Sequence, residues 1–140
     1  MTTVYEVLSD YCEDQDWRFY FGRLEHANLK GLEDDKIHCY LLLQRRSPTF
    51  NSYGITNYQY TIEIALLVRG DLTKEPKEKY LENLKRLYTA DSELSLHLKG
   101  CGLWNVQNWQ SVEVINLLDD AGDGLQITAD LIQKYRPYAT

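Results

Sequence analysis

The strongest constraint on the fold is a strict alternation of side chains between Tyr58 and Arg69. One set of positions is aromatic or aliphatic: Tyr58, Tyr60, Ile62, Ile64, Leu66 and Val68. The other set is mixed: Gln59, Thr61, Glu63, Ala65, Leu67 and Arg69. Because successive side chains of a strand point to opposite faces, this period of two predicts a β-strand with one buried face. The fold must therefore be built around a sheet.

Two segments have the period of an amphipathic helix instead. Apolar side chains near the N-terminus recur at helical spacing: Val4, Val7, Leu8, Tyr11 and Cys12. A second helix follows Pro76, with a predicted apolar stripe of Tyr80, Leu81, Leu84, Leu87 and Tyr88. Both patterns predict helices that pack one side on the sheet. The end of the second helix stays open, because Asp91–Leu98 fits either a longer helix or an edge strand.

The remaining apolar segments predict further strands. Trp17–Phe21 is short and aromatic, and Ile37–Gln44 is a nearly continuous apolar run that favours a buried strand. Between them, Arg23–Lys36 is polar and is expected to be a loop. Two strands around the acidic turn Asp119–Gly124 predict a closing β-hairpin.

These elements predict an α+β fold. We expect an antiparallel sheet of four to five strands with two helices packed on one face, in the order α-β-β-β-α-β-β. The 140 residues fit a single domain, 1–140, and a chain of this size buries about two thirds of its surface. The N-terminus lacks the pattern of a secretory signal, and no apolar run approaches about 18 residues. We therefore expect a cytoplasmic protein without a membrane-spanning segment.

Two segments are predicted to reach a neighbouring molecule. Residues 45–57 are longer than a simple hairpin loop needs, and we expect them to project as an arm that carries Arg45, Arg46, Phe50 and Tyr53. The second segment is a short C-terminal tail, 134–140. It carries three candidate interface residues, which are Tyr135, Arg136 and Tyr138. The arginines and aromatics of the arm also fit a nucleic-acid contact, but the net charge of −6 favours a subunit interface.

The acidic turn offers the most specific alternative, a calcium site. Asp119, Asp123, Gly124 and Asp130 occupy four positions of an EF-hand loop, but Ala121 replaces a ligand. The flanking segments also alternate as strands do, whereas an EF-hand requires helices. A hairpin turn is therefore favoured over a metal site.

Other chemistry-bearing residues lack a catalytic arrangement. His38 and Cys39 are adjacent on a strand, so they point to opposite faces. His26 and His97 lack the spacing of metal ligands, and the three cysteines, Cys12, Cys39 and Cys101, are too far apart for a metal knuckle. Glu63 and Glu113 fit ordinary strand faces. We predict no catalytic residue, no cofactor and no metal, and hence no enzyme.

The order of these pieces resembles the small tail-completion, tail-terminator and neck-ring subunits of tailed bacteriophages, particularly those of Bacteroidetes hosts. The resemblance is carried by Phe19–Leu24 after a helix, by Leu41–Pro48, by the strand Tyr60–Val68, and by the ending Val114–Asp120 and Gly124–Thr128. It covers nearly the whole chain in order. Arg45–Ser47 departs from it, since these proteins often have a more proline-rich or apolar segment there.

The resemblance implies a structural subunit of a head-tail connector or tail-terminator ring. Such subunits assemble in the host cytoplasm into virion necks and tails, often as six-fold or twelve-fold rings, next to portal, adaptor or tail proteins. DNA passes through the lumen without specific binding. The alternative is a small cytosolic ligand- or peptide-binding adaptor module without catalysis, and a third possibility is an enzyme with an unrecognised site.

Overall fold

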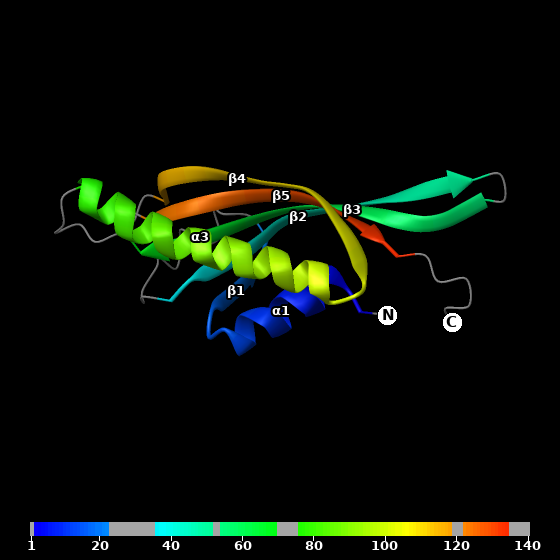
Figure 1. Cartoon of the computed structure of the whole chain (residues 1–140), viewed down its shortest axis with the longest axis horizontal. Helices are drawn as coiled ribbons and strands as arrows, with labels where there is room; N and C mark the ends of the chain where they lie inside the picture. The colour runs from blue at the N-terminus through cyan, green and yellow to red at the C-terminus, as the bar shows by residue number, and fades with distance from the viewer. Residues whose placement is uncertain (1, 23–35, 52–53, 70–75, 119–121, 135–140) are drawn as a thin grey trace.

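The structure is a computed structural model that describes residues 2–22, 36–51, 54–69, 76–118 and 122–134 (Figure 1). Its elements in chain order are α1 (Val4–Asp14), β1 (Arg18–Phe21), β2 (His38–Asn51), β3 (Gly54–Arg69), α3 (Pro76–Gly100), β4 (Trp104–Leu118) and β5 (Gly122–Gln133). This order of helices and strands agrees with the sequence expectation. The loop expected over Arg23–Lys36 falls almost entirely outside the described residues.

The sheet has five strands in the order β1-β2-β3-β5-β4. Three of the pairings are antiparallel, but β1 and β2 are parallel, with Arg18 opposite His38 and Phe21 opposite Leu41. The expectation of a wholly antiparallel sheet was therefore wrong, and the sheet is mixed. A parallel pair needs a crossover of about a dozen residues or more, and the chain between Phe21 and His38 is long enough to supply it.

Both helices pack on one face of the sheet and bury the main core between them (Figure 1). The alternation that begins at Tyr58 sets this face, because Ile62, Ile64, Leu66 and Val68 all point into the main core. The core also takes residues from both helices and β5: Val4, Leu8, Cys12, Leu87, Leu94, Leu98, Leu125 and Ile127. A smaller buried cluster of Tyr40, Ala65 and Leu67 lies on the opposite face.

The helix α1 begins at a defined cap. Thr3 has extended backbone, and its hydroxyl oxygen accepts a hydrogen bond of 3.1 Å from the Glu6 amide. Such a cap satisfies one of the free amides of the first turn and contributes about 1 kcal/mol. The helix then buries the five apolar residues that its spacing singled out.

The helix α3 continues to Gly100, so the segment Asp91–Leu98 is helical. Leu94 and Leu98 are buried four residues apart, whereas Leu96 between them is 67% exposed, as a helix requires. The predicted stripe was partly wrong, because Leu87 is buried but Leu81 and Tyr88 are each 42% exposed. The side chain of Tyr80 lies outside the described part of the chain.

The strand β2 is longer than its apolar run. It continues through Arg45 to Asn51 and pairs with β3 along the whole stretch, so these residues form a strand where a loop was expected. A β-bulge between Leu41 and Leu43 shifts the register, after which Arg45 lies opposite Thr61. Cross-strand pairing with β3 therefore overrides the turn-forming residues of this segment.

The antiparallel pairing of β4 with β5 confirms the predicted β-hairpin, and β4 forms an edge of the sheet. Strands, not helices, flank residues 119–121. Asp130, which the calcium alternative would use as a ligand, accepts hydrogen bonds from Asn108 Nδ2 at 2.8 Å and from Thr61 Oγ1 at 3.0 Å. Asn108 has a φ of 55° at a bulge of β4, a conformation that Asn adopts more readily than most residues.

Candidate functional site

The candidate site is the hairpin arm, defined here as residues 45–51 and 54–57 of β2 and β3. The pairing of β3 with β5 ends at Gln59 and Ile132, whereas its pairing with β2 continues to Gly54 and Asn51. The outer part of the arm, from Pro48 and its partner Tyr58 onward, therefore extends past the rest of the sheet (Figure 1). Of the predicted arm residues, Tyr53 lies outside the described residues.

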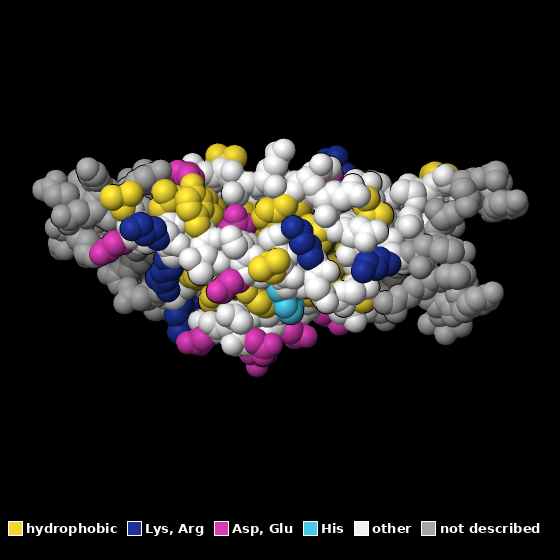
Figure 2. Space-filling view, in the orientation of Figure 1, with side chains coloured by type: hydrophobic (Ala, Val, Ile, Leu, Met, Phe, Trp, Pro, Cys, Tyr) yellow, Lys and Arg dark blue, Asp and Glu magenta, His cyan; other side chains and the backbone are white. Residues whose placement is uncertain are grey.

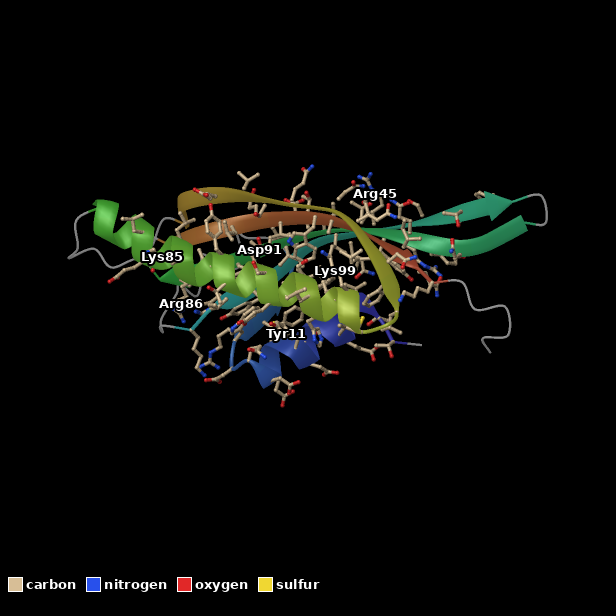
Figure 3. The ribbon with its side chains drawn as sticks, viewed as in Figure 1. Tyr11, Arg45, Lys85, Arg86, Asp91 and Lys99 are labelled. Carbon is tan, nitrogen blue, oxygen red and sulfur yellow. The ribbon has the colours of Figure 1, made fainter. Side chains whose placement is uncertain are left out.

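The two arginines of the arm have different environments. The guanidinium of Arg46 lies 3.5 Å from the ring centre of Tyr58, a cation–π contact between the two strands. Arg45 is exposed, lies opposite Thr61 where β3 is still paired with β5, and is labelled in Figure 3. Arg46 thus helps to hold the hairpin together, while the charge of Arg45 faces solvent.

Phe50 lies near the end of the arm and is 69% exposed. A large aromatic side chain gains free energy when its apolar surface leaves water, at about 25 cal/mol per Å². Within the described part of the molecule the arm does not cover this ring. Phe50 is therefore the best candidate in the arm for contact with another molecule.

The base of the arm is fixed to the end of β5. Asn57 Nδ2 donates to the Gln133 carbonyl at 2.9 Å, and the Tyr58 amide donates to Gln133 Oε1 at 3.3 Å. Thr49 Oγ1 donates to the Asn57 carbonyl at 3.0 Å and also contacts the Asn57 side chain. The arm and the start of the C-terminal tail therefore leave the sheet from one place.

The predicted tail residues Tyr135, Arg136 and Tyr138 lie outside the described residues. The tail begins at Lys134, which is exposed and whose amide donates to the Leu103 carbonyl at 3.2 Å. The structure thus brings the arm next to the first residue of the tail, although the two segments are far apart in sequence. This proximity could not be read from the sequence.

His38 and Cys39 point to opposite faces, as predicted. His38 Nδ1 lies 3.1 Å from the Tyr20 hydroxyl on the face away from the helices, and Tyr20 stacks on Tyr40 at 4.5 Å. Burial raises the pKa of the Tyr40 hydroxyl well above its usual value. A hydrogen bond with Cys12 and burial both raise the pKa of the Cys39 thiol, which makes it a poor nucleophile.

The other candidates from the sequence remain separate. His97 is exposed on α3 and packs against Tyr11 at 4.5 Å, while His26 lies outside the described residues. Glu63 lies opposite Thr128 and Glu113 opposite Leu125, whose side chain enters the main core, so the two carboxylates belong to opposite faces. In the described ranges, three or more His, Cys, Asp or Glu side chains nowhere gather as metal ligands do.

Sequence reasoning missed the exposed apolar residues of the helices and β1. Leu81, Tyr88 and Leu96 are exposed on α3, and Tyr5 and Phe21 are exposed where α1 meets β1. Among the described helices, none is long and apolar enough to cross a membrane. Neither a scan against protein-family models nor a search of curated proteins finds a match.

Proposed function

We propose that the chain is a non-enzymatic structural subunit of a phage head-tail connector or tail-completion ring. It assembles as a symmetric homo-oligomer around a DNA channel, in contact with portal, adaptor or tail proteins. The observation that supports this proposal most is the hairpin arm, which extends past the sheet and exposes Phe50. A ring subunit needs surfaces that reach its neighbours, and an arm that projects from the sheet can make such a contact.

The arm is easier to explain with a neighbour than without one. A two-stranded hairpin is marginally stable in water on its own, and here it is supported at its base by Gln133. An adjacent subunit that covers Phe50 stabilises the arm and buries its ring. Aromatic residues are enriched at the centres of such interfaces.

The charge of the chain fits a channel through which DNA slides. With 15 Lys and Arg against 21 Asp and Glu, the chain has a net charge of −6. A protein that binds DNA tightly neutralises phosphates with Lys and Arg and releases counterions. A subunit with excess negative charge instead repels the phosphates of the duplex. We therefore expect the assembled ring to show no stable binding to duplex DNA at physiological salt.

Deletion of the arm tests this function directly. Residues 48–58 are replaced by an Asn-Gly turn, which joins the paired residues Ser47 and Gln59 as a two-residue hairpin, and the native protein is imaged by negative-stain electron microscopy. We expect closed rings with a central opening for the wild type and isolated subunits for the shortened protein. Circular dichroism should show that the shortened protein keeps its fold.

Single substitutions refine the same test. Phe50→Ser should weaken assembly, whereas Leu43→Ser is the matched control, because Leu43 is also exposed on β2 but lies outside the arm. A wild-type protein that is monomeric alone and with neck partners would instead favour a small ligand- or peptide-binding module. Rings that survive loss of the arm would refute the role given to it.

A further inference from the structure

The outward side of α3 carries an ordered stripe of apolar and basic residues. We call it the α3 stripe, and its exposed members are Leu81, Lys85, Tyr88, Ser92, Leu96 and Lys99. Their spacing of three or four residues places them on one side of the helix, away from Leu87, Leu94 and Leu98 in the core. Figure 3 labels Lys85 and Lys99 on this outer side. The exposed carboxylates of α3, on Glu82 and Glu93, lie beside the stripe and not within it.

The exposed side of α1 has the opposite charge. Four carboxylates lie there, on Glu6, Asp10, Glu13 and Asp14, and α1 contains no Lys or Arg. At the edge of this side that meets β1, the exposed rings of Tyr5 and Phe21 meet edge to face at 5.6 Å. We call these six residues the α1 flank. Figure 2 shows acidic side chains gathered over α1, and both basic and acidic ones along α3.

These two surfaces do not meet within one chain. The helices lie side by side on the sheet, and Tyr11 of α1 contacts His97 of α3 at 4.5 Å. The carboxylates belong to the exposed side of α1, whereas Tyr11 belongs to its buried side. The α1 flank and the α3 stripe are therefore both open to another molecule.

We propose that the α1 flank of one copy docks on the α3 stripe of a second copy of this chain. Each surface offers what the other lacks: carboxylates with two aromatic rings on one side, and two lysines with three apolar side chains on the other. Because the two surfaces differ, every copy binds one neighbour through its α1 flank and another neighbour through its α3 stripe. A head-to-tail contact of this kind closes into a ring when the rotation between copies allows it. The inference rests on the proposed ring function and names the surfaces that build it.

Apolar contact and charge have separate roles at this interface. Exposed ion pairs each contribute about 0–1 kcal/mol and are screened by salt, so they cannot hold two copies together alone. Burial of the Tyr5 and Phe21 rings against Leu81, Tyr88 and Leu96 supplies the affinity. The carboxylates and lysines orient the copies and speed their association.

A charge swap tests the contact. The variants are Lys85→Glu with Lys99→Glu, Glu6→Lys with Asp10→Lys, and all four substitutions in one chain. The third variant keeps the net charge of −6, since two acids become lysines and two lysines become glutamates. Association is measured by sedimentation over a range of protein and salt concentrations. Each pair should weaken association by about tenfold or more, and the combined variant should restore it.

Leu96→Ser gives a second readout that does not depend on charge. This exposed residue should lower association while leaving the unfolding midpoint unchanged. If the wild type forms an oligomer that none of these variants weakens, the α1–α3 contact is overturned while the ring function stands. Failure of the combined variant to recover overturns the pairing of these surfaces. A wild type that never associates overturns both proposals.

Discussion

The hydrogen bond between Trp109 and Asp91 gives the sharpest test of how α3 is held on the sheet. Trp109 Nε1 donates to Asp91 Oδ1 at 2.7 Å, and both side chains are half-buried between α3 and β4. A hydrogen bond to a charged group contributes about 1.5–3 kcal/mol, and partial exposure favours the lower end. We expect Asp91→Ala to lower the free energy of unfolding by about 1.5 kcal/mol.

The assay is urea unfolding followed by far-UV circular dichroism, for Asp91→Ala, Trp109→Phe and the double variant. The double variant should lose about 1 kcal/mol less than the sum of the single losses, because both changes remove the same bond. Glu93→Ala, an exposed acid two residues from Asp91, is the control and should change stability by less than about 0.5 kcal/mol. Additive losses at Asp91 and Trp109 would refute the hydrogen bond as the link between α3 and β4.

Three further predictions concern the sheet. Asn108→Ala should destabilise the protein by about 1–2 kcal/mol in thermal unfolding, and more than Asn108→Gly, which loses the same bond to Asp130 but tolerates the positive φ. The Asn108 hydrogen bond holds the pKa of the Asp130 carboxyl below its usual value. The stability that the ionised Asp130 carboxylate contributes is therefore complete above about pH 4 and is lost as pH falls through the lowered pKa. The unfolding free energy of Asp130→Asn, measured over the same pH series, should lack this pH-dependent loss. Leu66→Ala, in the core, should cost about 2–5 kcal/mol in the same urea assay, and a loss below about 1 kcal/mol would contradict its burial.

The helices and strands could be predicted because their patterns are local. The alternation from Tyr58 and the helical spacing from Val4 both record which side chains a single element buries. No local sequence pattern indicates the parallel pairing of β1 with β2, since this pairing depends on where the chain returns to the sheet after residue 22. The neighbouring position of β3 and β5 likewise follows from the packing of the whole sheet.

Two predictions were wrong because strand pairing and helix packing depend on the whole sheet and not on the local sequence. Pro48 and the two arginines predicted a loop after Gln44, but a strand with one free edge tolerates such residues when its other edge is paired. Leu81 and Tyr88 were assigned to the buried side of α3 because apolar residues usually are buried. Their exposure became visible only when the sheet fixed which side of α3 faces the core.

The candidate site was predictable only in part. Phe50 and Arg45 could be chosen because they lie in a segment, residues 45–57, that is longer than a simple hairpin loop needs and carries residues that suit interfaces. The contact of the arm base with Gln133 joins residues 76 positions apart in the chain, and no local pattern encodes it. The same holds for the acidic side of α1 and the lysines of the α3 stripe, which matter only once the two helices are placed on one face.

The mass of the native protein in solution, measured by light scattering alone and with candidate neck proteins, tests the central proposal most directly. We predict a closed oligomer of six or twelve copies that depends on the arm. A protein that stays monomeric at every concentration, and with every candidate partner, would contradict it.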